Sequence, residues 1–253
     1  MDVISLQSGS NGNCFYVSSG DVGLLIDAGI SGIQAETRLA RHGIDIRSAS
    51  AVLISHDHRD HIASAGTFQR KYKLPIYITR STLLAARRWC NLGRLEDVRF
   101  FQSGDTLRIE HVQVHSIVTP HDGADGVAFV IEDGNHRVGI LTDLGHVFDG
   151  LREVLTSLDA VVIESNYDVR MLATGSYPEH LKRRIAGPRG HLSNDESASL
   201  VSSGKRLQWA MLAHLSEENN CPDLAHQTHS NAVQGEIPIY VASRYEASPC
   251  LRV

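Results

Sequence analysis

The sequence predicts an α/β fold in which strands and helices pack in layers. Short apolar runs of strand length alternate with segments of helical periodicity along all 253 residues, which is the pattern of a layered α/β domain. No low-complexity segment, linker or charge block divides the chain. Several of the apolar runs end in an acidic residue or a histidine. We therefore expect a single domain, residues 1–253, with polar side chains at one rim of a sheet.

The predicted strands are continuous apolar runs, as expected for strands that are buried on both faces. Their ranges are 22–27, 51–55, 75–78, 111–118, 126–132, 137–143, 159–164, 209–214 and 237–242.

The predicted helices lie between these strands. Their approximate ranges are 32–42, 62–72, 81–91, 177–186, 194–203 and 222–232. Ser81 and Asn194 are expected to cap two of them, because short polar side chains accept hydrogen bonds from the first free backbone N–H groups of a helix.

Composition excludes several classes of protein. A net charge of −5 argues against a generally basic nucleic-acid-binding coat, although local basic patches remain possible. The sequence contains no apolar run of the length that a membrane span needs, and its first residues do not resemble a signal peptide. Four scattered cysteines without a CxxC pair favour a reducing compartment, so we expect a cytoplasmic protein.

Five apolar runs lead directly into a polar residue that can bind a metal or move a proton. These residues are Asp27, His56, Asp143, Glu164 and His214. A polar residue at a strand exit lies at the rim of the sheet, where α/β proteins bind their ligands. One such residue is an ordinary strand end, but five of them predict that several strand ends form one site.

The stretch SHDHRDH, residues 55–61, is the most specific motif. His56 and His58 are two residues apart, so they point to the same side of an extended backbone. Asp60 and His61 follow at the turn into a helix. This geometry can place the first two histidines on one metal ion and Asp60 and His61 on a neighbouring ion. Neutral imidazole and carboxylate groups suit zinc, manganese or iron(II).

These motifs resemble those of the metallo-β-lactamase-fold hydrolases, in the same order along nearly the whole chain. Asp27 in LLIDAG, the SHDHRDH stretch, TPHD, LTDLG and AHLSEENN match the five family motifs. The resemblance implies an αββα four-layer sandwich with two mixed sheets inside. It also implies that two metal ions are bound by His56, His58, Asp60, His61, His121, Asp143 and His214. Asp143 would bridge the two ions, and Asp27 would support the ligands.

A closer resemblance links the chain to the YycJ/WalJ-type proteins, near the tRNase Z branch, through SGSNGNCFYV, ESNYD and GHLSN among other segments. Within that branch a glutamate after a strand and a histidine in a later element form a catalytic pair, and Glu164 and His191 occupy the matching places. With Asp60 they are the expected catalytic residues. The resemblance implies a phosphodiester hydrolase, expected to be a nuclease acting on DNA or RNA, with two divalent cofactor ions, zinc or manganese, with iron possible.

Several alternatives remain open. The substrate can be DNA, RNA or a small cyclic phosphodiester, and a thioester or lactone hydrolase of the glyoxalase II-like branch would use the same metals. A redox enzyme of this fold would usually carry a glutamate where His58 stands. A non-catalytic metal-dependent regulator would be expected to have lost ligands, and none is missing.

Three other features allow two interpretations each. The loop SGSNGN, residues 8–13, is either a tight turn or a cradle of backbone N–H groups for a phosphate. His226 and His229 are expected on a solvated helix face rather than at a metal. The basic clusters at 87–88 and 182–184 are either solvated or contact a nucleic-acid backbone.

Overall fold

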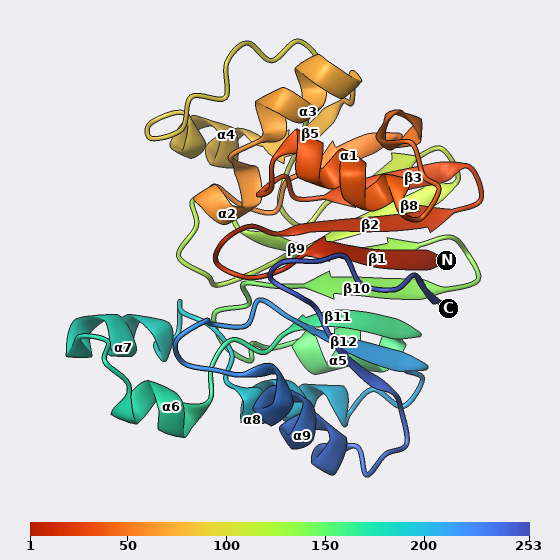
Figure 1. Ribbon diagram of the computed structural model, residues 1–253. Coiled ribbons are helices and arrows are strands. Elements are labelled where there is room, and N and C mark those ends of the chain that lie inside the picture. Colours follow the sequence, from red (N-terminus) through yellow and green to blue (C-terminus); the bar gives the residue numbers. More distant parts are fainter. The chain divides into compact units, whose positions relative to one another are not determined.

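The computed structural model describes residues 1–253 and forms two compact units. Unit 1 comprises Met1–Val118, Gly123–Val127 and Ser243–Val253; unit 2 comprises Thr119–Asp122 and Ala128–Ala242. The chain contains two mixed β-sheets of seven strands each, flanked by helices (Figure 1). This result confirms the α/β class with two mixed sheets, while the assignment of residues 1–253 to one domain stays a prediction.

The sheet of unit 1 has the strand order β14-β1-β2-β3-β4-β5-β6. Its strands are β1 (Asp2–Gln7), β2 (Cys14–Ser19), β3 (Val22–Ile26), β4 (Ala51–Leu53), β5 (Ile76–Thr79), β6 (Val98–Phe101) and β14 (Leu251–Arg252). Strands β1 to β3 pair antiparallel, whereas β3, β4, β5 and β6 pair parallel. The carboxyl ends of these four parallel strands therefore lie along one edge of the sheet.

Three amphipathic helices cover one face of this sheet (Figure 1). They are α1 (Gly32–Ala40), α3 (Ala65–Tyr72) and α4 (Arg80–Ala86), and the short helix α2 (Arg59–Ile62) lies between β4 and α3 in the chain. Leu39 of α1 and Phe68 of α3 are fully buried in one cluster with Leu25, Val52 and Ile76 of the strands. Burial of such side chains stabilises the fold by about 1.5–3 kcal/mol each.

The second sheet has the order β13-β12-β11-β10-β9-β8-β7. Its strands are β7 (Thr106–Ile109), β8 (Val112–Val118), β9 (Val127–Glu132), β10 (Arg137–Leu141), β11 (Ala160–Glu164), β12 (Trp209–Ala213) and β13 (Ile239–Val241). Strands β10, β11, β12 and β13 pair parallel, so in unit 2 also the carboxyl ends of neighbouring strands share one edge.

Five helices belong to unit 2: α5 (Leu151–Ser157), α6 (Val169–Thr174), α7 (Glu179–Ile185), α8 (Asn194–Val201) and α9 (Pro222–Ala232). Helices α6 and α7 form a separate segment of this unit (Figure 1). Tyr167, Leu172 and Ile185 give it a small buried cluster of its own. This segment ends shortly before His191.

The ranges predicted for strands and helices differ from the structure in several places. Strands β1, β2, β6, β7 and β14 and helices α5 and α6 were not expected, and α4 ends at Ala86 rather than at 91. Strand β1 escapes a search for apolar runs because the polar residues Ser5 and Gln7 are buried within it. Short edge strands such as β6 and β7 carry exposed charges and lack a clear period.

The two predicted caps are displaced. Thr79, not Ser81, caps α4 by accepting the Thr82 N–H. Ser193, not Asn194, caps α8 in a capping box with Glu196. In each case a hydroxyl lies immediately before the helix, where its oxygen reaches the free N–H groups. No helix in the structure combines the length and apolar character needed to cross a membrane.

The expectation that His229 lies on a solvated face is wrong. Its side chain is fully buried; its Nδ1 lies 2.9 Å from the Ala225 carbonyl oxygen and its Nε2 3.0 Å from Ser197 Oγ of α8. Burial lowers the pKa of His229 to about 4, because the charged imidazolium loses its hydration. His229 therefore connects α9 to α8 as a neutral side chain.

We predict that His229 makes unit 2 sensitive to acid. The unfolded chain binds a proton at this position below about pH 6.5, whereas the folded chain binds it only near pH 4. Stability contributed by neutral His229 is therefore full above pH 6.5 and falls by up to about 3 kcal/mol as the pH drops toward 4. Urea unfolding between pH 4 and pH 8 measures this loss. His229→Gln should flatten that part of the profile; an unchanged slope would contradict the prediction.

Candidate functional site

In unit 1, the polar side chains follow β3 and β4, which are parallel neighbours. Asp27 comes directly after β3, with a positive φ of 66°. Ser55 and His56 follow β4, and His58 stands at the N-cap of α2, which carries Asp60 and His61. Positive φ is uncommon for a residue with a side chain and costs on the order of 1–3 kcal/mol. The surrounding contacts therefore have to hold Asp27 in place.

The buried carboxylate of Asp27 accepts three hydrogen bonds. Its oxygens lie 2.8 Å from the Ser55 N–H nitrogen, 2.9 Å from Ser55 Oγ and 2.7 Å from His61 Nδ1. A carboxylate at Nδ1 fixes the proton of the imidazole on that nitrogen and leaves the lone pair on Nε2. The predicted support of the ligands by Asp27 has this geometric basis.

The four residues of the SHDHRDH motif form one cluster in unit 1. The ring centroid of His56 lies 4.6 Å from that of His58 and 4.2 Å from that of His61. Asp60 Oδ2 lies 3.4 Å from His61 Nε2. The Nδ1 atom of His56 lies 2.9 Å from Ser55 Oγ. Three imidazoles and one carboxylate thus gather at the edge where the parallel strands end.

Asn13 is a residue of this cluster that sequence reasoning missed. Its fully buried side chain places Nδ2 3.0 Å from His61 Nε2 and 3.3 Å from Asp60 Oδ2. Its Oδ1 accepts the Gly9 N–H at 3.0 Å. The loop 8–13 is therefore a turn organised around Asn13. The only hint in the sequence is an asparagine placed between a glycine turn and an apolar strand.

Gly29, the last residue of the LLIDAG segment, occupies a position where only glycine fits. A β-carbon at this position would lie 1.7 Å from the carbonyl oxygen of Asp60, so the two backbones approach each other too closely for any other residue. The Gly29 N–H donates to the Asn13 carbonyl at 2.9 Å. Glycine here lets three segments of unit 1 meet beside the motif.

In unit 2, polar residues again follow parallel strands. Asp143 comes after β10, Glu164 ends β11 and His214 follows β12. Asp143 and His214 both have a φ of 56°. Together with His191, these residues offer one ligand atom each, and the four atoms lie within 4.8 Å of one another.

Glu164 occupies the centre of this cluster and is fully buried. Its Oε1 lies 2.6 Å from His191 Nδ1, and its Oε2 accepts the Leu144 N–H at 3.0 Å. The residues predicted as a catalytic pair are thus in direct contact. The second bond fixes the backbone next to Asp143, a role that the sequence did not suggest.

His121 is also held by its Nδ1 atom, which lies 2.7 Å from the carbonyl oxygen of Gly190. Its Nε2 lies 3.5 Å from Asp143 Oδ1. A carbonyl oxygen accepts only, so Nδ1 carries the proton and the lone pair of Nε2 faces Asp143. His121 and Asp143, which are separated in the sequence, therefore lie together in unit 2.

Asn166 is a second polar residue that the sequence analysis passed over. Its Nδ2 donates to the His214 carbonyl oxygen at 2.8 Å and lies 3.2 Å from His214 Nδ1. Asn220, by contrast, donates to the backbone carbonyls of Ser165 and Asn166 and shapes the loop. The two asparagines of ESN and EENN thus support the strand ends rather than extend the cluster.

The donor chemistry of both clusters fits a divalent transition metal. Unit 1 offers three imidazoles and the Asp60 carboxylate; unit 2 offers His121, His191, His214, Asp143 and Glu164. Imidazole with carboxylate is the ligand set of zinc, manganese and iron(II), and histidines fixed through Nδ1 are typical of metal ligands.

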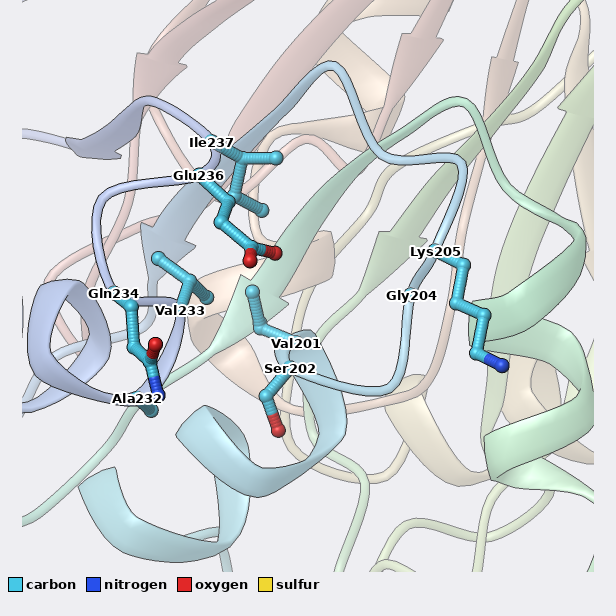
Figure 2. Close-up of a pocket in the computed structure, with 9 residues that line it drawn as sticks. All are labelled: Val201, Ser202, Gly204, Lys205, Ala232, Val233, Gln234, Glu236 and Ile237. Carbon is cyan, nitrogen blue, oxygen red and sulfur yellow. The ribbon is translucent and has the colours of Figure 1, made fainter.

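Unit 2 also contains a pocket of about 240 Å³ that is unrelated to these clusters (Figure 2). Val201, Lys205, Val233 and Ile237 are among its lining residues. They belong to the connections that precede β12 and β13, whereas the polar residues follow strands of the same sheet. The pocket therefore lies at the amino ends of the strands, away from the candidate site.

Comparisons with known proteins agree on one family. The model of the beta-lactamase superfamily domain matches residues 23–210. Exodeoxyribonuclease YycJ of Bacillus anthracis is 34% identical over 231 residues, which cover 90% of this chain and 88% of the relative. Exodeoxyribonuclease WalJ of Streptococcus pneumoniae serotype 2 (strain D39) is 34% identical over 250 residues, 96% and 93% of the two chains.

Among solved structures, the metallo-beta-lactamase fold protein YhfI from Bacillus subtilis superposes with a TM-score of 0.75. The match covers 98% of each chain at 18% sequence identity, which establishes a shared fold and nothing further.

We predict that Asn13 stabilises the motif of unit 1. Asn13→Ala removes the donor to Asp60 and His61 and leaves the Gly9 N–H without its acceptor, so the free energy of unfolding should fall by about 1–3 kcal/mol. Urea denaturation measures the change. Asn11→Ala is the matched control in the same loop, because the Asn11 side chain is exposed and donates only to the Arg244 carbonyl. Equal stability of both variants would refute the role of Asn13.

Proposed function

The chain belongs to the metallo-β-lactamase superfamily and, within it, to the YycJ/WalJ group, and we propose that it is a metal-dependent exonuclease that hydrolyses phosphodiester bonds in DNA. The names of its relatives confirm, at the level of the family, the expected hydrolase of the phosphodiesterase and nuclease type. Action on DNA from an end is the specific activity that we propose.

In this proposal both units belong to one domain, residues 1–253, and their polar strand ends hold two divalent ions. Seven residues would hold these ions: His56, His58, Asp60, His61, His121, Asp143 and His214. The fixed imidazoles of His61 and His121 support this assignment, because each is bound at Nδ1 and presents Nε2. Zinc or manganese suits the ligands, and iron is possible.

Bound at such a site, two divalent ions would activate water and offset the negative charge of a phosphodiester. The protein's own contribution is to move a proton. His191 donates one to the oxygen that leaves, and the buried carboxylate of Glu164 orients its ring through the contact at Nδ1. Asp60, as a ligand beside His61, takes part in positioning the reacting groups.

The contact between Glu164 and His191 is the observation that favours a phosphodiester substrate. An alkoxide is a poor leaving group and needs a proton, whereas a thiolate leaves without one. An acid pair of this kind is therefore useful for a phosphodiester and of little use for a thioester, which argues against the glyoxalase II-like alternative. A small cyclic phosphodiester would use the same pair and remains the second candidate. A non-catalytic regulator has no need of the pair.

We also propose DNA as the partner and the cytoplasm as the location. All four cysteines are free, which supports a reducing compartment. The exposed arginines of α7 and of the segment after α4 are candidates to contact the phosphate backbone.

We predict close to two metal ions per purified chain. Asp143→Ala should lower that content and abolish hydrolysis, because the variant loses a carboxylate that would hold the metal. Elemental analysis after growth with zinc or manganese measures the content. The control is Asp149→Ala, since Asp149 is exposed in a nearby loop. Wild-type protein that reproducibly binds no metal, with no metal-dependent shift in melting temperature, would refute the site.

We predict that His191→Ala slows the cleavage of DNA by roughly a hundredfold or more, the usual contribution of a general acid. Hydrolysis of bis(p-nitrophenyl) phosphate should slow much less, because p-nitrophenolate leaves without a proton. Initial rates with linear DNA and with the small diester measure this difference. Glu164→Gln is the companion variant, since its amide oxygen can still accept the Leu144 N–H while the carboxylate beside His191 is removed.

Two results would contradict the proposed function. Equal slowing of both substrates in His191→Ala would assign this histidine to structure or metal binding instead of proton transfer. Robust thioester hydrolysis, with no diester cleaved in the presence of either metal, would refute the substrate class. Salt should weaken the cleavage of DNA more than that of the small diester, because binding of the backbone releases counterions.

A further inference from the structure

A pocket in unit 1 lies at the ends of β5 and β6. It has a volume of about 530 Å³, and all of its lining residues belong to unit 1. This size is in the range of small-molecule sites, about 300–1,000 Å³. Arg80 and Ser81 follow β5, and Phe100, Gln102 and Ser103 belong to the end of β6 and the residues after it.

The order of strands places this pocket beside the SHDHRDH motif. Strands β4, β5 and β6 are parallel neighbours, so the pocket and the motif share the edge formed by their carboxyl ends. Neighbouring strands lie about 4.8 Å apart. The pocket therefore begins at the strand next to the one that leads to His56.

The loop of residues 123–127 contacts the SHDHRDH motif and also lines the pocket. A β-carbon on Gly123 would lie 3.1 Å from His56 Cβ, and the Ala124 N–H donates to Asp57 Oδ1 at 2.8 Å. The next residue, Asp125, lines the pocket, and its carbonyl oxygen accepts a hydrogen bond from Thr82 Oγ1 at 3.3 Å. One short loop thus touches the motif at one end and the pocket at the other.

The lining of the pocket suits a nucleobase. The ring of Phe100 is 41% exposed although it lies on a strand, and the guanidinium carbon of Arg80 lies 4.1 Å from its centroid. An aromatic ring paired with a guanidinium plane is a platform on which bases of any sequence stack. Gln102 and Ser103 add groups that form hydrogen bonds with the edge of a base.

The charge of the lining argues against a phosphate as occupant. Arg80 is its one cation, whereas Asp105 and Asp125 are both carboxylates. Carboxylates repel a phosphate but accept hydrogen bonds from the amino groups of adenine, guanine and cytosine. The pocket therefore favours the base of a nucleotide over its phosphate.

We propose that this pocket is a nucleobase subsite, which binds a base of the DNA strand next to the bond being cleaved by stacking on Phe100 and Arg80. This inference rests on the proposed nuclease function. The subsite would add base stacking to the backbone contacts that hold a DNA strand. It also implies that substrates without a base bind more weakly.

The test measures binding of dAMP to the metal-loaded protein by calorimetry, with deoxyribose 5-phosphate and inorganic phosphate as probes that lack the base. Wild-type protein should bind dAMP more tightly than either probe. Phe100→Ala and Arg80→Ala should weaken dAMP binding about tenfold, the scale of one stacked base, and leave phosphate binding unchanged. Phe100→Trp should retain binding, because it preserves the aromatic platform.

Two matched variants control for general surface effects. Arg41→Ala removes another exposed arginine of unit 1, at the end of α1, and Tyr240→Ala removes another exposed aromatic ring, 37% exposed, from the second sheet. Neither should change dAMP binding. All variants should melt at the wild-type temperature, which separates lost recognition from lost folding.

The outcomes distinguish this inference from the proposed function. In a working nuclease, Phe100→Ala should raise KM for single-stranded DNA about tenfold and leave the hydrolysis of methyl p-nitrophenyl phosphate unchanged. DNA cleavage and dAMP binding that are both unaffected by Phe100→Ala would overturn the subsite while the nuclease function stands. If the wild type cleaves no diester, the proposed function fails, and the dAMP titration still decides whether the pocket binds a base.

Discussion

Parallel pairing of neighbouring strands is the constraint on which the candidate site depends. In unit 1, β3 and β4 pair parallel, so Asp27 and His56, which follow them, lie at the same edge of the sheet. In unit 2, β10, β11 and β12 pair parallel and place Asp143, Glu164 and His214 at one edge in the same way. Residues far apart in the sequence become neighbours because the strands before them are hydrogen-bonded in register. The chemistry of each unit therefore follows from backbone pairing before any side chain is considered.

The same strand exits are also where the backbone departs from ordinary geometry. Asp27, Asp143 and His214 all have positive φ values. Each turns sharply at the end of a buried strand, and each is held by side-chain or backbone contacts nearby. Left-handed residues that carry side chains cluster at functional sites, where surrounding contacts compensate for the strain. Positive φ values occur at strand ends in both units, and this supports a functional role for the residues that carry them.

Much of this arrangement could be predicted from the sequence, because apolar runs followed by a polar residue report strand exits directly. The pairing of Glu164 with His191 was expected from motif resemblance, and Asp27 was expected to support a metal ligand without the ligand being specified; the roles of these residues stay predictions. The sequence could not reveal Asn13 or Asn166, since asparagine is common in turns and only tertiary contacts distinguish these two. It misplaced His229 because helical spacing cannot tell a buried imidazole from a solvated one.

The two carboxylate oxygens of Glu164 make different contacts, and this limits which substitutions the site can accept during evolution. One oxygen of this carboxylate fixes the backbone beside Asp143, and the other orients His191. Substitution at position 164 therefore alters the loop of a proposed metal ligand and the proton donor together. Evolution toward a substrate that needs no proton donor can discard His191 alone, but it has to keep an acceptor at 164. Among descendants with new substrates, position 191 should vary more freely than position 164.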